Sequence, residues 1–556
     1  MLSVGYSALN EELTISGEAH FRAQSEIRIT DVSLYITSNN GVEDYNSTYG
    51  KNSMKVGVTL PSNNSSVTYK VTVTNYSNIP MQLKTIEKEI ENNNYVVTFN
   101  KTLPLTIGKL SSEEIEITYK NSTNESQTIN ANLLFTFTKL EAVMAQGNNG
   151  IATSTFYNGP LTKDSIESIT FMPTKEIPEE AIGYWDCSYN AGSNEVIAYY
   201  LNGETEGMYD LYIAADGEVY APVSASSLFH NFNKLVSINF NDSFNTEKST
   251  NMASMFSNCS SLTSLDLSSF NTENVTSMSF MFMNLSKLEE LDVSNFNTLK
   301  VTTLANTFVG CKALKELDLN SWYTPNLVAQ YNAGNGLFTN CSSLKILKID
   351  NFDTSKMNNM RQMFQGCTSL ISVDVSSFDT SNVTNMQAMF SGCKALTELN
   401  LANFNTAKVT TMANMFNSCS QLKSINLSNF NTEKVTSMTN LFQLCTSLKK
   451  INVTGWNTKK VTNMSGMFSY CSALEEIEGL SYFEIDSITT LGGMFMRSPK
   501  LTTIDISGMD FENKSVTTTN MFESTPSGST IYVKNEYNKE YIENIKSGLN
   551  VIIPET

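Results

Sequence analysis

Hydrophobic positions recur along most of this chain with a nearly constant period. A phenylalanine opens each repeat, and the next one follows after 26 or 27 residues, or once after 30. The anchor residues are Phe229, Phe256, Phe282, Phe308, Phe338, Phe364, Phe390, Phe416, Phe442, Phe468, Phe495 and Phe522. A period of about 20–50 residues is typical of proteins built from stacked structural repeats. The pattern therefore predicts an array of about twelve similar coils instead of one ordinary core.

Each repeat contains two groups of apolar positions. In the unit after Phe256, the spacing L-x-x-L-x-L ends in Leu265 and Leu267, which would face the same side of a short strand. Met278 and Met281 lie three residues apart before the next phenylalanine, which predicts a helical turn. Asn-Thr pairs between these groups predict a column of turns, in which side chains cap backbone groups and form hydrogen bonds between neighbouring coils. We therefore expect a leucine-rich-repeat solenoid of parallel strands and short helical turns.

The first 140 residues follow a different pattern, in which apolar and polar residues alternate. Runs such as 27–37 and 67–74 are rich in Val, Ile, Thr and aromatic residues, and Asn/Ser clusters separate them. A period of two over about seven short runs predicts an all-β Ig-like sandwich over residues 9–140. Residues 1–8 are interpreted as the remnant of a signal peptide or as a cloning scar, and both alternatives stay open.

Shorter segments connect and close these two regions. Residues 141–152 have turn residues and no periodicity, which indicates a linker. Residues 153–228 contain strand-like runs and an Asp-Gly hairpin turn, and they are interpreted as the N-terminal cap of the repeats at 229–526. Residues 527–556 are interpreted as the C-terminal cap, with a helix expected over 535–546. No apolar run approaches the ~18 residues of a membrane span, so none is expected in this chain.

The repeated cysteines and methionines are expected to be structural. Eight of the nine cysteines lie three residues after an anchor phenylalanine, a slot that Leu285 fills in another repeat. An apolar slot favours buried free thiols, although neighbouring coils would bring cysteines close enough for disulfides, so that alternative stays open. Most of the 25 methionines share their slots with leucine, which favours core packing.

Composition excludes several classes of function. The chain has 55 Asp and Glu against 37 Lys and Arg, a net charge of −18, and an acidic chain repels nucleic-acid phosphates. Two histidines argue against a histidine metal site or a Ser-His-Asp triad. No dinucleotide-binding or phosphate-binding loop is present, so no cofactor is expected. Carboxylate pairs occur almost everywhere on the outward face of the repeats and therefore do not indicate catalysis. The chain is not expected to be an enzyme or to hold a metal.

Outward positions beside the buried leucines form the expected working surface, because repeat proteins bind through such extended faces. A solvated acidic face without a partner is the alternative reading. One repeat also carries four extra residues in or near 327–336, and insertions in repeats form loops that often contact partners. The candidate partner-binding residues are Asp266, Glu290, Asp292, Glu316, Asp318, Tyr323, Tyr331, Asp374 and Glu398.

The repeat F-x-x-C-x-x-L-x-x-L-x-L-x-x-F-N-T-x-x-V-T-x-M-x-x-M-F resembles that of the BspA-type leucine-rich-repeat surface proteins of bacteria. It is most similar to the 26-residue variant of Gram-positive and mycoplasma surface proteins, over residues 185–525. This resemblance implies a secreted or cell-surface, non-enzymatic protein used in adhesion or host interaction. It carries over no catalytic or ligand-binding residue.

We therefore expect an extracellular surface protein that binds a protein or glycan on a host or neighbouring cell through its repeat face. The alternative is a structural subunit of a surface layer or filament, in which case the chain would self-assemble.

Overall fold

The computed structural model describes residues 27–38, 43–44, 48–49, 52–61, 65–76, 80–90, 94–108, 110–139, 142–145, 160–189, 195–327 and 336–554. Contacts divide the chain into two compact units, one of residues 1–142 with 216–218 and one of residues 143–215 with 219–556. Residues 1–8, predicted to be a leader remnant or scar, lie outside the described residues.

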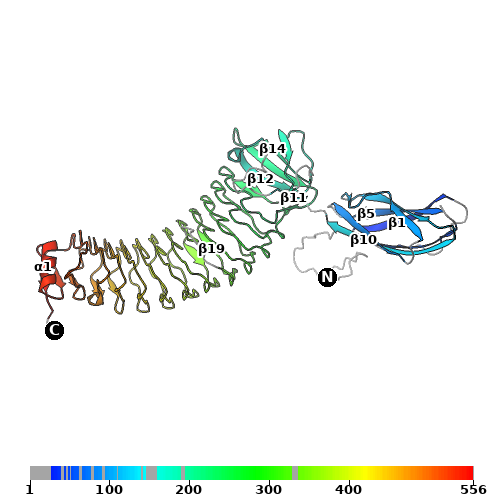
Figure 1. The fold of residues 1–556 in the computed structure, drawn as a ribbon. Helices are drawn as coiled ribbons and strands as arrows, with labels where there is room; N and C mark the ends of the chain where they lie inside the picture. The colour runs from blue at the N-terminus through cyan, green and yellow to red at the C-terminus, as the bar shows by residue number, and fades with distance from the viewer. Residues whose placement is uncertain are drawn as a thin grey trace, which may run out of the picture. The chain divides into compact units, whose positions relative to one another are not determined.

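The first unit contains two antiparallel sheets (Figure 1). One has the strand order β1-β5-β9-β7, and the other has the order β2-β4-β10-β6-β8 with β3 paired to β4. The strands are β1 Ile27–Ser38, β2 Glu43–Asp44, β3 Thr48–Tyr49, β4 Ser53–Leu60, β5 Ser66–Asn75, β6 Met81–Ile90, β7 Tyr95–Phe99, β8 Leu105–Ile107, β9 Ser112–Asn121 and β10 Gln127–Lys139.

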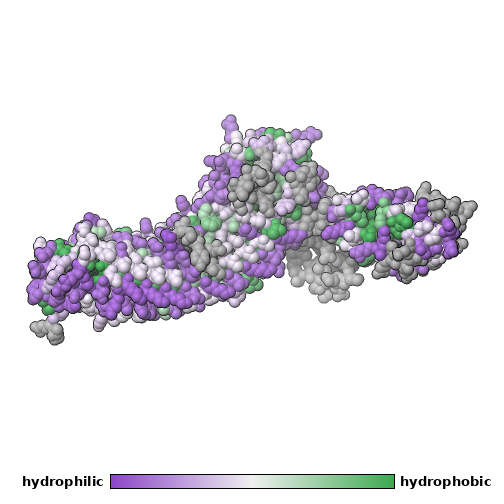
Figure 2. Space-filling model, in the orientation of Figure 1, coloured by the Kyte–Doolittle hydropathy of each residue, from purple (hydrophilic) through white to green (hydrophobic). Residues whose placement is uncertain are grey.

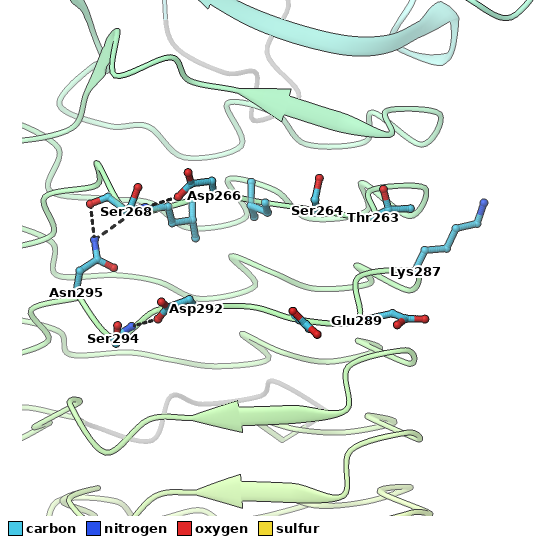
Figure 3. Close-up of a pocket in the computed structure, with 12 residues that line it drawn as sticks. Thr263, Ser264, Asp266, Ser268, Lys287, Glu289, Asp292, Ser294 and Asn295 are labelled. Atoms are coloured by element: carbon cyan, nitrogen blue, oxygen red, sulfur yellow. Dashed lines mark hydrogen bonds between the residues drawn. The ribbon is translucent and has the colours of Figure 1, made fainter.

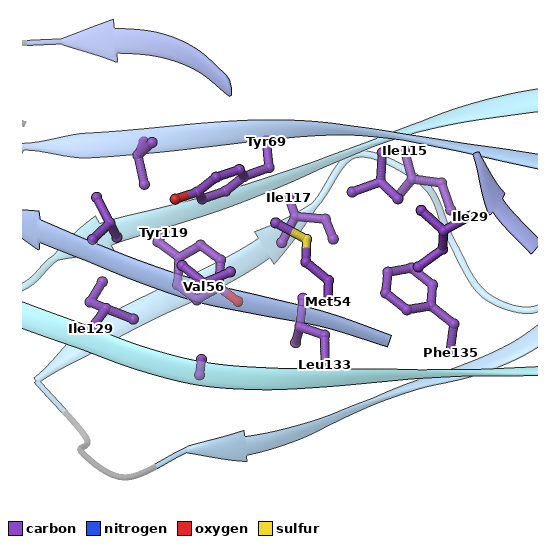
Figure 4. Packing of buried hydrophobic residues seen from close by; sticks show 14 of the residues in the cluster. Ile29, Met54, Val56, Tyr69, Ile115, Ile117, Tyr119, Ile129, Leu133 and Phe135 are labelled. Atoms are coloured by element: carbon purple, nitrogen blue, oxygen red, sulfur yellow. The ribbon is translucent and has the colours of Figure 1, made fainter. Parts of the chain in front are cut away.

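The alternation of side chains along these strands builds the core of this unit. In β5, Val67, Tyr69, Val71 and Val73 are fully buried, and residues between them are more exposed. Side chains from both sheets meet in one apolar cluster, where Met54 lies among isoleucines and aromatic rings (Figure 4). Successive side chains of a strand point to opposite faces, so the period of two places one face of each strand in the core.

The second unit begins with a mixed five-stranded sheet of order β13-β14-β15-β12-β17 and a three-stranded sheet of order β11-β16-β18. Their bounds are β11 Ala142–Val143, β12 Ile166–Met172, β13 Gly183–Asp186, β14 Val196–Asn202, β15 Tyr209–Ala215, β16 Val219–Tyr220, β17 Ser237–Asn239 and β18 Phe244–Asn245, with the 3-10 turn η1 at Lys163–Ser165. Phe171 of β12 packs edge-on against the first anchor, Phe229, at a ring distance of 6.3 Å. This contact covers the apolar end of the first coil.

Successive repeats lie next to one another as coils that are joined by backbone hydrogen bonds (Figure 1). In the coil of Phe256, every second N–H donates to the following coil. The bonds are Met252 N to Ser277 O (2.9 Å), Ser254 N to Ser279 O (2.8 Å), Phe256 N to Met281 O (2.9 Å) and Asn258 N to Met283 O (2.8 Å). In the described repeats, the same parallel bridges recur from Ser224 to Thr303 and from Asn359 to Thr517.

The leucine side of the coils contains few regular strands. In the described repeats, three-residue strands pair as β19 Glu316–Asp318 with β20 Ile346–Lys348, and as β21 Lys450–Asn452 with β22 Glu476–Glu478. At the C-terminal end lie η2 Leu480–Tyr482, the sheet of β23 Thr503–Asp505, β24 Thr530–Tyr532 and β25 Asn550–Ile552, and the helix α1 Glu536–Ile545. The helix expected over 535–546 is thus confirmed, with Asn535 as its N-cap.

The predicted fold class, an Ig-like sandwich followed by a leucine-rich solenoid of parallel strands and helical turns, is wrong. The described residues form mostly small antiparallel and mixed sheets, the parallel strands of the repeats are only three residues long, and α1 is the one α-helix among these residues. The Met-x-x-Met segments are not helical because alternate amides donate to the following coil, as Met278 N does to Thr303 O (3.2 Å) and Phe280 N to Ala305 O (2.9 Å). Met281 N donates to Met278 O (3.1 Å) in a tight turn, whereas Phe282 N donates to Thr307 O of the following coil (3.0 Å). A helix would need those donors for carbonyls four residues earlier.

The anchor phenylalanines form the centre of the coil core. Rings of successive anchors are 5.3–6.1 Å apart and tilted by at most 18°. The repeat cysteines are buried free thiols, as the apolar slot predicts. Cys419 Sγ, for example, donates to Phe390 O at 3.2 Å. Burial raises the pKa of the Cys419 thiol to about 12, so this group stays protonated at neutral pH and is unreactive.

The predicted threonine ladder between coils is confirmed. The hydroxyl of Thr272 donates to Asn297 O (3.0 Å) and accepts from Asn297 N (2.7 Å). Thr406 makes the same pair of bonds to Asn431, and both threonines are buried. One buried side chain thus satisfies both backbone groups of a residue in the following coil, which fixes the spacing of the two coils on this side.

Candidate functional site

The aspartates of the predicted binding face have a structural task. Asp266 Oδ1 accepts the backbone N–H of Ser268 at 2.9 Å, two residues further along the chain. The same turn recurs where Asp292 accepts from Ser294 (2.9 Å), Asp318 from Asn320 (3.0 Å) and Asp374 from Ser376 (2.9 Å). Asparagine accepts the equivalent backbone N–H in other coils, at Asn400, Asn426 and Asn452. One oxygen of each carboxylate is therefore committed to its own turn.

These bonds lower the pKa of the aspartates. The backbone N–H of Ser268, followed by its hydroxyl, stabilises the charged form of Asp266 and lowers the pKa of that carboxyl. Ser294 has the same effect on the pKa of Asp292. For Asp318, the ammonium group of Lys348 is the first cause of the lowered pKa. The aspartates thus remain anionic at neutral pH while they support the turns.

Glutamates and lysines complete the charge pattern of the face. Lys315 forms an ion pair with Glu289, and Lys348 lies 2.9 Å from Asp318 Oδ2 and 3.6 Å from Glu316 Oε1. These pairs are exposed and connect neighbouring coils. Exposed pairs stabilise a fold by about 0–1 kcal/mol, so their main effect is to distribute charge over the surface.

A groove of about 710 Å³ lies between the coils of Phe256 and Phe282 (Figure 3). Its lining brings together three of the predicted residues, Asp266, Glu290 and Asp292. Two charged residues that the prediction did not include, Lys287 and Glu289, also line it. The position equivalent to Glu289 in the following coil is Lys315. A position that accepts either charge is expected to be exposed, so the sequence could have predicted that Glu289 lies on the surface.

The other predicted residues do not line this groove. Glu316 and Asp318 lie in β19 of the following coil, and Asp374 and Glu398 belong to coils further along the array. Tyr323 is 54% exposed, which is compatible with ligand contact. Tyr331 lies outside the described residues.

The visible face of the repeats is mostly hydrophilic with small hydrophobic patches (Figure 2). Ile346 and Ile371, on adjacent coils of the leucine side, are 48% and 52% exposed. No cluster of three metal-binding side chains is found in the part of the chain that the structure describes. Among those residues there is also no helix with the length and apolar character that crossing a membrane requires.

A comparison with protein families matches the repeats. The model of a family described as "Mycoplasma protein of unknown function, DUF285" matches residues 223–333, 332–450 and 423–535. The three matches run in tandem and together span more than half of the chain. Searches of curated proteins and of solved structures returned no match.

Proposed function

We propose, on the premise that this chain belongs to the DUF285 family of Mycoplasma proteins of unknown function, that it is a cell-surface binding protein. In this proposal the repeat array holds a protein or glycan partner and has no catalytic role. The resemblance of the repeat to BspA-type surface proteins supports adhesion as the purpose of that binding.

The groove between the coils of Phe256 and Phe282 is the observation that carries this proposal. Its lining has four carboxylates, from Asp266, Glu289, Glu290 and Asp292, against the single ammonium of Lys287. Such a surface attracts cationic groups, and charge complementarity raises association rates and excludes acidic competitors. We therefore infer that the partner is a protein that presents a lysine- or arginine-rich segment.

The backbone around the groove favours binding without rearrangement. The turns at Asp266 and Asp292 are closed by their own side chains, and Asn295 Nδ2 donates to Leu267 O of the preceding coil at 3.0 Å. A pre-ordered surface loses less conformational entropy when a partner docks. The repeats thus provide a rigid support for charges that differ from coil to coil.

The test is a binding screen of the full chain against immobilised host matrix proteins and glycans, with a triple variant that neutralises the groove. Glu289→Gln, Glu290→Gln and Asp292→Asn remove three charges, and asparagine keeps the turn acceptor. The matched control is Glu475→Gln, Glu476→Gln and Glu478→Gln, which changes the same three slots in a distant coil. We expect the groove variant to lose binding at least tenfold and the control to retain it.

Equal losses in both triple variants would refute the groove as the binding site and leave only a general charge effect. Light scattering on the same samples separates binding from the filament alternative. A binding protein should remain monomeric over a concentration series, whereas mass that grows with concentration would indicate a self-assembling subunit.

A further inference from the structure

A position two residues before the anchor phenylalanine has a left-handed backbone in eleven coils, and a second position has one in every coil. The second position lies two residues after the anchor phenylalanine, and its φ is between +55° and +77° in all twelve coils. The residues are Asn231, Asn258, Asn284, Gly310, Asn340, Gly366, Gly392, Ser418, Leu444, Tyr470, Arg497 and Ser524. Asparagine and glycine tolerate this conformation, whereas a bulky residue there is a genuine outlier.

The first seven coils obey this preference, and their residues interlock. Asn258 Nδ2 donates to Asn231 Oδ1, and Asn284 Nδ2 donates to Asn258 Oδ1, both at 2.7 Å. A Cβ at Gly310 would collide with Asn284 Oδ1, so a larger residue there would require the Asn284 side chain to turn away. From Ser418 onwards no asparagine fills the preceding slot, and the column has room for larger side chains.

Three consecutive coils use that room for Leu444, Tyr470 and Arg497. Their backbone N–H groups donate to carbonyls of the following coils at 2.7–2.9 Å, so the strained conformation is held firmly. Leu444 is 38% exposed. The Arg497 guanidinium lies 5.3 Å from the ring centre of Tyr470, and its Nε donates to Glu523 at 3.2 Å. We name these three side chains the C-terminal strip.

The strip places bulky side chains where the turn of the coil favours asparagine or glycine, which lowers stability. Phe280, two residues before its anchor, is another bulky residue with a left-handed backbone, so it is the exposure and chemistry of the strip that point to a contact site. Tyrosine and arginine are also the residue types that contribute most to protein interfaces. The two terminal amino groups of Arg497 make no hydrogen bond within the described residues, and the guanidinium lies over the Tyr470 ring.

We propose that the C-terminal strip is a second protein-contact site, which binds a segment with a carboxylate next to an apolar side chain. The carboxylate would accept two N–H bonds from the planar guanidinium of Arg497, the geometry for which arginine is suited. The apolar side chain would rest on Leu444 and the Tyr470 ring. The strip would bind an acidic segment, whereas the groove attracts cationic groups. The two sites would therefore bind different partners.

The test uses a display library of random 12-residue peptides selected on the full chain. We expect enriched peptides to share an Asp or Glu beside an apolar residue. Their affinity should fall at least tenfold in the variant Leu444→Asn, Tyr470→Asn and Arg497→Asn, which places the residue preferred by the column at each position. Its melting temperature should not fall below that of the parent chain.

Controls make the outcome decisive. Ser418→Asn changes the same column outside the strip and should leave peptide affinity within twofold. The groove variant of Glu289, Glu290 and Asp292 should also retain it, so failure of one site is distinguishable from failure of the other. Arg497→Lys keeps the charge without the planar fork and should weaken binding even if the triple variant misfolds. The proposal is overturned if no acidic peptide is enriched, or if Arg497→Lys and the triple variant bind as tightly as the parent.

Discussion

Thr406 allows a direct test of the idea that side-chain hydroxyls hold the coils together. Its Oγ1 donates to Asn431 O at 2.9 Å and accepts from Asn431 N at 2.7 Å, and the residue is 1% exposed. Thr406→Val removes the hydroxyl and keeps the branched shape. It leaves one buried donor and one buried acceptor without partners, each at a cost of about 1–3 kcal/mol.

We therefore expect Thr406→Val to lower the free energy of unfolding by about 2–4 kcal/mol. Thr406→Ser keeps both hydrogen bonds and loses one methyl group, so it should cost about 1 kcal/mol. Thr410→Val serves as the control in the same coil, because Thr410 is exposed although it donates to Thr384 O at 3.0 Å. An exposed substitution of this kind should change stability by less than about 0.5 kcal/mol.

Urea unfolding followed by circular dichroism compares the three variants. Hydrogen exchange at the Asn431 amide adds a local measurement, because long repeat arrays do not always unfold in one step. Protection of that amide should fall about 30-fold or more in Thr406→Val and remain nearly unchanged in Thr406→Ser. If the valine and serine variants are equally stable and equally protected, the hydroxyl does not join the coils, and packing alone accounts for the threonine column.

Three further predictions concern the turns, the core and the thiols. Asp292→Asn should leave stability at neutral pH unchanged, whereas Asp292→Ala should cost about 1 kcal/mol in urea unfolding, because only the alanine loses the turn acceptor. The lowered pKa of Asp292 stabilises the fold above the carboxyl's unfolded pKa of about 3.9. That contribution is lost as pH falls through the lower folded pKa, so the parent chain should lose more stability than Asp292→Asn between pH 5 and about 2.5, and an equal loss would contradict the assignment. Phe390→Ala should cost about 3–5 kcal/mol in the same assay, since Phe390 stacks on both neighbouring anchors, and a cost below about 1 kcal/mol would contradict its central place in the core. Cys419 should resist a maleimide reagent at pH 7.5 until urea unfolds the array, and rapid labelling of the native chain, read by mass spectrometry, would show that the thiol is accessible.

The period of the anchor phenylalanines predicted correctly which side chains are buried and that neighbouring coils contact each other. It could not predict the local backbone, because a spacing of three residues fits a helical turn and a tight turn equally well. Met278 and Met281 illustrate this, since both are buried although no helix forms. A signal against the helix was present: asparagine or glycine follows the anchor by two residues in seven coils, and such residues favour left-handed turns.

The candidate site was harder to predict because one residue can be exposed, charged and structural together. Asp266 and Asp292 do line the groove, but each also closes its own turn. Asparagine at the equivalent Asn400 indicates that the slot requires a side-chain oxygen and not a charge. The residues that distinguish one coil from another are therefore the better guide to binding.

By that criterion Glu289 and Glu290 should decide the affinity of the groove, and Asp292 should mainly preserve its shape. Glu289→Gln with Glu290→Gln should reproduce most of the effect of the triple variant, whereas Asp292→Asn alone should change partner affinity less than about threefold, a difference in binding free energy of under about 0.7 kcal/mol.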